Sequence, residues 1–327
     1  MENQELNDKI SASSSWIPDV KAEMGRVLIG QHELVDRLIL ALLCNAHVLL
    51  EGVPGLAKTL SVRALSGALR VDFSRLQFTP DLLPSDLLGT MIYNPQDSTF
   101  APKLGPVFSN LILADEINRA PAKVQSALLE AMQERQVTLG EQSFPLPDPF
   151  LVLATQNPID QEGTYQLPEA QLDRFIFKIQ VDYPTKDQEL QILDMMATSA
   201  KPKETKPVCT PEQIKESREL INQIYIDPAV REYIVDLVLA TRNPAAVDHG
   251  LKNFIRSGAS PRATINLALG ARALAFTHGR SFVKPQDVKD LAPDILRHRI
   301  LLSYEAEAEN VTSDTIVERI LSKVPVP

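Results

Sequence analysis

The chain has 327 residues, of which 44% are hydrophobic and 23% charged, and its formal net charge is −9 at pH 7. This composition is that of an ordinary globular protein with room for two domains, and the negative charge disfavours nucleic acid as the main partner. The two cysteines, Cys44 and Cys209, indicate neither a disulfide framework nor a thiolate metal site, and the lack of an apolar leader or a long apolar run predicts a cytoplasmic protein with no membrane insertion.

The first part of the chain predicts a flexible start followed by helices. Residues 1–15 are polar and rich in serine, so we expect them to be flexible. Helices are expected over about Pro18–Val27 and about His32–Asn45, the second because its leucines recur with helical spacing.

An apolar strand, a glycine-containing loop and a helix follow in His47–Leu60. The loop has the sequence GVPGLAKT, Gly52–Thr59. Strand, loop and helix in this order are typical of a phosphate-binding loop, because backbone N–H groups and the positive end of the helix converge on phosphates. Lys58 would reach the β- and γ-phosphates, and the Thr59 hydroxyl would ligate Mg²⁺.

The loop departs at one position from the usual pattern G-x-x-x-x-G-K-[ST]. Ala57 stands where that pattern has glycine, so the position must tolerate a Cβ atom. The alternative interpretation is a helix-capping loop with a solvated Lys58.

A half-buried strand over Val71–Phe78 is indicated by alternating apolar and polar residues. Prolines and a glycine break up the segment that follows, to Gly89, and for Asn94–Pro106 we expect a loop with room for a short hairpin.

A second motif with chemical meaning is NLILADEIN, Asn110–Asn118. Its apolar residues predict a buried strand that ends in two carboxylates, as a Walker B element does. Asp115 would hold Mg²⁺ through water, and Glu116 would act as general base on the attacking water.

A helix over Pro121–Arg135 and a hairpin over Gln136–Pro145 are expected next. A third apolar strand, Phe150–Ala154, leads to Asn157, whose amide could position the hydrolytic water. A turn asparagine at a strand end is the alternative.

Two arginines further along are candidates for contact with the γ-phosphate. Arg174 precedes another apolar strand, Phe175–Val181, and could be an arginine finger that reaches a neighbouring subunit; the alternative is local pairing with Asp173 or Glu169. Arg262 lies in the first turn of a helix that begins at Ser260-Pro261, where the helix dipole disfavours a cation unless an anion is near. A solvated arginine is the other interpretation.

From Asp182 onward, strand patterns give way to helices with clear start signals. Capping boxes are expected at Thr185 and Thr210, and N-caps followed by proline at Asp227 and Ser260.

The motifs GVPGLAKT, LILADEINRA, ATQNP, QLPEAQLDRF and GASPRA, in this order, resemble those of the MoxR family of AAA+ ATPases. The resemblance extends from about Val27 to about Arg299, and the family's loop has alanine where this chain has Ala57. It implies an α/β fold: a P-loop NTPase αβα core with a five-stranded parallel sheet, followed by a small all-helical lid. We therefore expect a flexible N-terminus (1–15), a nucleotide-binding domain (16–184) and a lid (185–327).

The resemblance also implies roles for residues. Asn157 corresponds to sensor 1, Arg262 to sensor 2 and Arg174 to the arginine finger, for which Arg119 is an alternative. Phe78–Gly89 corresponds to part of the helix-2 insert and Gln136–Pro145 to the pre-sensor hairpin. The predicted nucleotide-binding residues are Ile29, Gly30, Gly52, Val53, Pro54, Gly55, Leu56, Ala57, Lys58, Thr59, Leu60 and Arg262.

In function, the resemblance implies an ATPase with ATP or ADP and Mg²⁺ as ligands. It would form a nucleotide-dependent homo-oligomeric ring, a hexamer, and act like a chaperone in the assembly, activation or metal insertion of partner complexes, with a von Willebrand factor A-domain protein as one possible client. The alternatives are a magnesium-chelatase-like motor subunit, a slow nucleotide-dependent binding switch and, less favoured by the net charge, a DNA-remodelling ring.

Overall fold

The computed structural model describes residues 2–52, 58–96, 98–156, 165–198 and 203–327. The chain folds into two compact units, each assembled from separate stretches of sequence. The sheet unit comprises Trp16–Pro168 and Ile179–Lys215, and the helical unit comprises Met1–Ser15, Glu169–Lys178 and Glu216–Pro327.

A five-stranded sheet with the order β2-β5-β8-β1-β9 forms the centre of the sheet unit. The pairs β2–β5, β5–β8 and β1–β8 are parallel. The strands are β1 (Val48–Glu51), β2 (Phe73–Gln77), β5 (Leu111–Asp115), β8 (Leu151–Gln156) and β9 (Phe177–Gln180). The predicted five-stranded parallel α/β core is thereby confirmed.

The three central strands β1, β5 and β8 are buried along nearly their whole length. Their side chains are buried up to the last residue of each strand (Glu51, Asp115 or Gln156), which is polar and partly exposed. Continuous apolar runs of this kind occur in parallel strands because helices cover both faces of the sheet. The helices of this unit are α2 (Trp16–Gly25), α3 (His32–Leu43), α4 (Lys58–Leu69), α5 (Pro84–Leu88), α6 (Ala122–Glu134) and α8 (Lys186–Met196).

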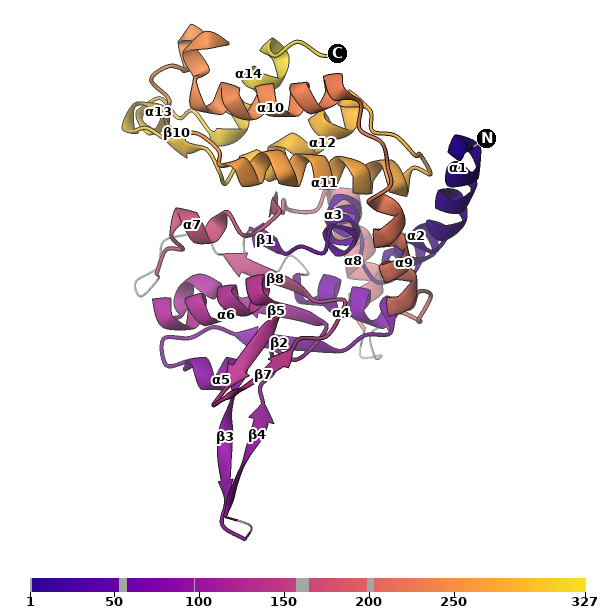
Figure 1. Ribbon diagram of the computed structural model, residues 1–327, viewed down its shortest axis with the longest axis vertical. Coiled ribbons are helices and arrows are strands. Elements are labelled where there is room, and N and C mark those ends of the chain that lie inside the picture. The colour runs from indigo at the N-terminus through magenta and orange to yellow at the C-terminus, as the bar shows by residue number, and fades with distance from the viewer. Residues whose placement is uncertain (1, 53–57, 97, 157–164, 199–202) are drawn as a thin grey trace. The chain divides into compact units, whose positions relative to one another are not determined.

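Two hairpins extend the sheet unit. The expected one consists of β6 (Gln136–Leu139) and β7 (Gln142–Pro145), joined at Gly140. The other consists of β3 (Gly89–Asn94) and β4 (Thr99–Leu104) and projects as a long ribbon (Figure 1).

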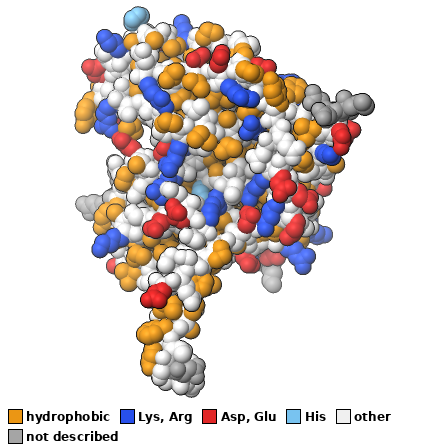
Figure 2. Space-filling model, in the orientation of Figure 1, with side chains coloured by type: hydrophobic (Ala, Val, Ile, Leu, Met, Phe, Trp, Pro, Cys, Tyr) orange, Lys and Arg blue, Asp and Glu red, His pale blue; other side chains and the backbone are white. Residues whose placement is uncertain are grey.

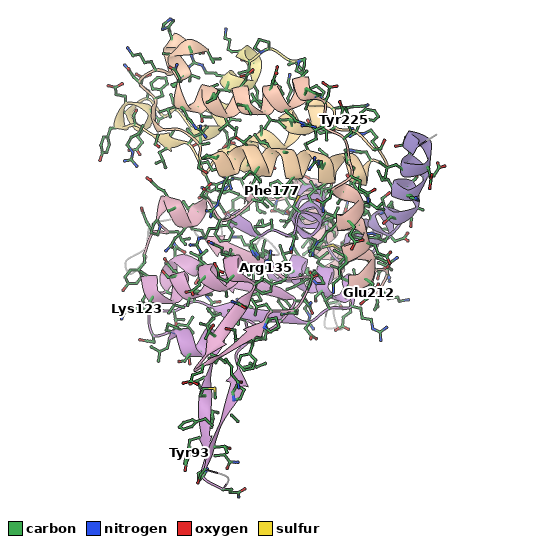
Figure 3. The ribbon with its side chains drawn as sticks, in the orientation of Figure 1. Tyr93, Lys123, Arg135, Phe177, Glu212 and Tyr225 are labelled. Carbon is green, nitrogen blue, oxygen red and sulfur yellow. The ribbon has the colours of Figure 1, made fainter. Side chains whose placement is uncertain are left out.

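The β3–β4 ribbon is longer than the short hairpin that the sequence suggests. All six residues of β4 are exposed and none in β3 is fully buried, so these two strands lack the buried face that creates the alternation by which strands are predicted. The rings of Tyr93 and Phe100 pair across it with centroids 5.2 Å apart, and hydrophobic side chains cover much of it (Figure 2). Tyr93 lies close to its tip (Figure 3).

The helical unit is built largely from the last third of the chain. Its helices include α10 (Pro228–Arg242), α11 (Pro261–Thr277), α12 (Pro285–Leu296), α13 (Tyr304–Ala308) and α14 (Ser313–Lys323), with the short α7 (Glu169–Leu172), whereas α9 (Pro211–Ile221) begins in the sheet unit. The predicted caps form: Asp227 accepts the N–H of Ala229, and Ser260 accepts the N–H of Arg262. At α8, Thr185 and Gln188 make the predicted capping box.

The start of the chain is helical, although its polar composition gives no helical signal. Helix α1 (Glu2–Ser13) belongs to the helical unit. Ile10 is fully buried, and the Asn7 side chain accepts the N–H of Ser281 at 3.0 Å. These tertiary contacts stabilise a helix that its polar sequence does not predict.

A short two-stranded sheet is the second departure from expectation, because only helices are predicted after Asp182. Strand β10 (Ile255–Ser257) pairs with β11 (Leu301–Leu302) within the helical unit. Two or three residues are too few to show strand periodicity. No helix in the described ranges is both long enough and apolar enough to cross a bilayer.

Candidate functional site

A cavity of about 580 Å³ lies at the carboxyl ends of the parallel strands of the sheet unit. Ligands in open α/β sheets bind at this edge, and the volume falls in the usual range for small-molecule sites. The predicted residues that line it are Ile29, Gly52, Lys58, Thr59, Leu60, Asp115 and Glu116. Residues distant in sequence thus meet at one cavity.

Gly52 and Lys58 flank the predicted phosphate-binding loop. A Cβ atom at Gly52 would lie 2.9 Å from the carbonyl oxygen of Val181, so this position requires glycine. The Lys58 ammonium donates a hydrogen bond to the carbonyl of Gly52. Partial burial lowers the pKa of Lys58, and the nearby carboxylates of Asp115, Glu116 and Glu51 oppose that shift. The three carboxylates stabilise the Lys58 ammonium, which is the cationic group that an anionic ligand would meet on this side of the cavity.

Asp115 and Glu116, at the end of β5, each bond to cationic or amide groups. Arg75 donates to Asp115 Oδ2 from Nη2 at 2.6 Å and from Nε at 3.2 Å. Glu116 Oε2 accepts from Gln77 Nε2 at 2.9 Å and lies 3.1 Å from Arg119 Nε. Both carboxylates therefore bond to donors from neighbouring side chains.

Thr155, near the end of β8, bonds to both acidic residues. Its Oγ1 accepts the backbone N–H of Glu116 at 2.8 Å, and its hydroxyl donates to Asp115 Oδ1 at 2.8 Å. Arg75, Gln77 and Thr155 all line the cavity, and no local sequence pattern predicts their contacts with the carboxylates. Their signal is positional: they stand at the carboxyl ends of β2 and β8, which flank β5 in the sheet.

One side of the cavity is apolar. Its lining there comes from the segment after α2 and from α8, namely Val27, Leu28, Ile29, Ile192, Met195 and Met196. Gly30 lines a smaller adjoining pocket of about 130 Å³. Its φ of +75° favours glycine, and a Cβ atom there would meet the Gln188 side chain at 2.5 Å.

The remaining predicted site residues fall into two groups. Val53, Pro54, Gly55, Leu56, Ala57 and Asn157 fall outside the described residues. Arg174 and Arg262 belong to the helical unit.

The helical unit engages both carboxylates that the sequence offers as local partners for Arg174. Asp173 Oδ1 accepts from Arg299 Nε at 2.7 Å, and its Oδ2 accepts from Ser260 Oγ at 2.8 Å. Arg262 Nη1 lies 3.7 Å from Asp173 Oδ2. Glu169 pairs with Arg256 at 2.7 Å.

The donor set fits Mg²⁺. The Thr59 hydroxyl and the Asp115 carboxylate, which line the same cavity, are hard oxygen ligands of the kind Mg²⁺ binds together with water and phosphate oxygens. Within the described ranges, no group of three His, Cys, Asp or Glu side chains forms a separate metal site.

Comparison with known proteins supports the same interpretation. The family described as "ATPase family associated with various cellular activities (AAA)" matches residues 47–177, and the AAA lid domain matches residues 251–320. Chaperone MoxR1 of Mycobacterium tuberculosis is 47% identical over 306 residues, which cover 93% of this chain and 81% of that protein. This chain belongs to the MoxR family of AAA+ ATPases.

Other relatives of this MoxR-family chain agree. The uncharacterised protein YeaC of Bacillus subtilis is 44% identical over 304 residues, which cover 93% of this chain and 92% of YeaC. Protein MoxR of Paracoccus denitrificans is 30% identical, with 98% and 99% of the two chains covered. The 2.00 Å crystal structure of a candidate ATPase from Cytophaga hutchinsonii superposes with a TM-score of 0.93 at 50% identity, over 100% of this chain and 99% of the other. The predicted family and fold are confirmed.

Proposed function

We propose that this MoxR-family chain binds ATP in the cavity of the sheet unit and hydrolyses it to ADP and phosphate with Mg²⁺. The observation that carries the proposal is the meeting of Lys58, Thr59, Asp115 and Glu116 at that cavity. An ammonium, a hydroxyl and two carboxylates are the groups that phosphoryl transfer to water requires.

Each group has a distinct role in the proposal. Lys58 binds the β- and γ-phosphates, and Thr59 and Asp115 hold Mg²⁺, which neutralises charge on the phosphates when bound. Glu116 accepts a proton from the attacking water as general base. Glu116 Oε2 contacts Gln77 and Arg119, and these contacts would have to open if that oxygen is the one that takes the proton.

The apolar side of the cavity would receive the adenine base, next to Ile29 and Gly30. Its aliphatic and thioether side chains, including Met195 and Met196, can pack on both faces of a planar ring. The loop residues Val53–Ala57 would surround the phosphates with backbone N–H groups, and Leu60 continues the helix behind them.

Catalysis by arginine belongs to the same proposal. Arg262 in cis and Arg174 from a neighbouring subunit would neutralise charge on the γ-phosphate, while Asn157 positions the water. Such an arrangement needs a homo-oligomeric ring, a hexamer by family resemblance. Hydrolysis would then drive chaperone-like assembly, activation or metal insertion of client complexes, among them a von Willebrand factor A-domain protein.

The test is ATP turnover of wild type and Glu116→Gln at increasing protein concentration with Mg²⁺. We expect activity per subunit to rise with concentration, because a shared site needs a neighbour. Glu116→Gln should bind ATP with similar affinity but lose at least about 100-fold in kcat, the usual contribution of a general base. Glu130→Gln, an exposed change on α6, should leave kcat unaltered.

A slow nucleotide-dependent switch is the second candidate, favoured by the engagement of Glu116 with Arg119 and Gln77. It predicts tight nucleotide binding and negligible turnover at every concentration. A magnesium-chelatase-like motor would hydrolyse ATP as well and would differ only in its client.

A further inference from the structure

Glu116 has an unusual backbone conformation for a residue with a side chain. Its φ and ψ are 56° and 50°, in the left-handed helical region. A Cβ atom makes this region unfavourable, so residues other than glycine stay there only where surrounding contacts hold them. The direction of the Glu116 side chain depends on this conformation, because φ and ψ orient the Cα–Cβ bond relative to β5.

One contact that holds Glu116 comes from the neighbouring strand. Its N–H donates to Thr155 Oγ1 at 2.8 Å. The ladder between β5 and β8 ends at the pair Ala114 and Ala154, so the Glu116 amide lies beyond it and bonds to a side chain instead.

The same hydroxyl also fixes Asp115. A hydroxyl has one hydrogen to donate and two lone pairs to accept; here it accepts from Glu116 and donates to Asp115 Oδ1 at 2.8 Å. Thr155 is only 2% exposed, and branching at Cβ restricts its χ1 rotation. A single buried hydroxyl therefore ties the main chain of one acidic residue to the side chain of the other.

The position of Thr155 in the sheet links both predicted motifs. Its backbone pairs with Leu50 of β1, the strand that leads into the phosphate-binding loop. Its side chain reaches the end of β5. Thr155 thus stands between the strand that leads to Lys58 and the strand that carries the two carboxylates.

The two oxygens of Asp115 have different kinds of partner. Oδ1 bonds to the buried Thr155, whereas Oδ2 bonds to Arg75, whose side chain is 50% exposed. Arg75 can exchange with another cation at Oδ2 while the Thr155 bond persists. The Thr155 contact is therefore suited to remain in place when the cavity is filled.

We infer that Thr155 is a positioning residue for ATP hydrolysis: its hydroxyl holds Glu116 in the left-handed conformation that directs the general base and keeps Asp115 Oδ2 turned to the cavity. The inference rests on the proposed hydrolysis. It assigns a function to the hydroxyl itself, which the methyl group that replaces it in valine cannot perform.

The experiment compares Thr155→Val, which keeps the shape and removes the hydroxyl, with Thr155→Ser, which keeps the hydroxyl. Thr155→Val should lower kcat by about 10–100-fold, because a small misplacement of a catalytic group has effects of this size. KM for ATP should change less than about threefold, since the phosphate-binding loop is untouched. Thr155→Ser should recover kcat to within about threefold of wild type.

Thr205→Val is the matched control. Thr205 also lies in the sheet unit, and its hydroxyl donates to the carbonyl of Ala64 at 2.7 Å, away from the carboxylates. This variant loses a hydrogen bond of the same kind and should keep wild-type kcat. Thermal unfolding of all variants separates a loss of folded protein from a loss of positioning; Thr155→Ala replaces Thr155→Val if the latter does not fold.

Two results would overturn the inference. If wild type hydrolyses ATP and Thr155→Val keeps its kcat, the hydroxyl does not position the carboxylates, while the proposed function stands. If Thr155→Ser is as slow as Thr155→Val, the hydroxyl is not the group that matters. Absence of turnover in wild type under all conditions would overturn the proposed function together with this inference.

Discussion

At the scale of single residues, Arg75 pairs with the carboxylate that we propose holds Mg²⁺. Arg75 contacts Asp115 Oδ2 through two nitrogens, at 2.6 and 3.2 Å. A guanidinium and Mg²⁺ both seek carboxylate oxygen, so they compete for the same atom. The pair is part-exposed and hence weak enough to exchange.

We expect Arg75→Gln to lower the Mg²⁺ concentration needed for half-maximal ATPase activity several-fold, because the competing cation is removed and Asp115 keeps its charge. The measurement is a Mg²⁺ titration of activity at fixed ATP, with a parallel titration of nucleotide binding. Arg63→Gln serves as control, since it removes the same charge from a surface pair with Glu204. A higher Mg²⁺ requirement in Arg75→Gln would mean that Arg75 helps to bind the phosphates.

The roles of some residues of this site can be predicted from the sequence, and those of others cannot, for a physical reason. Lys58, Thr59, Asp115 and Glu116 stand in local motifs, so their chemistry is predictable from a few neighbouring letters. Arg75 and Gln77 stand in no such motif. Thr155 lies within ATQNP, but its contacts with the carboxylates, like those of Arg75 and Gln77, exist because β2 and β8 flank β5. Strand order is a property of the folded sheet, and no spacing along the chain encodes it directly.

At the scale of elements, a buried histidine joins three parts of the sheet unit. His47 stands just before β1; its Nδ1 accepts the N–H of Val152 in β8 at 3.0 Å, and its Nε2 lies 3.1 Å from the carbonyl of Met132 in α6. The two bonds require a neutral ring with its hydrogen on Nε2. Burial, with help from the charge of Arg135, lowers the pKa of His47 to about 3.

Acid should therefore weaken the sheet unit. The unfolded chain takes up a proton near pH 6.5 whereas the folded chain resists to about pH 3, so the contribution of His47 is complete above pH 6.5 and declines below it. Between pH 7.5 and 5.5 we expect His47 to cost about 1.4 kcal/mol of unfolding free energy. Urea denaturation followed by the fluorescence of Trp16, the single tryptophan, reports on this unit.

The control for this prediction is a pair of variants. His47→Gln should be less stable at pH 7.5 and should lose less stability than wild type on acidification. His32→Gln, at an exposed position, should keep the wild-type pH dependence. If His47→Gln and wild type decline in parallel, other groups govern the acid response.

Elements differ in how far their sequence predicts them. The central strands are predictable because both of their faces are buried, which leaves continuous apolar runs such as Leu111–Ala114. Helix α1 and the β3–β4 ribbon are not, since the first has a single fully buried hydrophobic residue, Ile10, and the second has no covered face. Specific tertiary or cross-strand contacts stabilise them, and such contacts leave no periodic pattern in the sequence.

At the scale of the whole molecule, the helical unit combines three stretches of chain, and a buried ion pair is among the contacts that join two of them. Residues 169–178 carry Asp173, whose carboxylate receives Arg299 from the segment after α12. Arg299 has a 1% exposed side chain and also donates to the carbonyls of Asp173 and Phe175 at 3.0 and 2.6 Å. Burial lowers the pKa of Arg299 to about 10, and Asp173 opposes that shift.

Asp173→Asn should destabilise the helical unit by about 3–5 kcal/mol, because removing one partner of a buried pair leaves an uncompensated charge. Glu169→Gln is the matched control four residues away: its pair with Arg256 has the same 2.7 Å distance, but both side chains are more than half exposed, so we expect a loss of at most about 1 kcal/mol. Urea denaturation followed by circular dichroism measures both.

The double variant Asp173→Asn/Arg299→Met should recover part of the lost stability, since it also removes the unpaired charge of Arg299. Equal losses in Asp173→Asn and Glu169→Gln would mean that Asp173 does not act through Arg299. Asp173 also accepts a hydrogen bond from Ser260 at the start of α11. Arg174 follows Asp173 in the chain and Arg262 follows Ser260 by two residues, so the loss of this ion pair would disturb the backbone that carries both candidate γ-phosphate arginines.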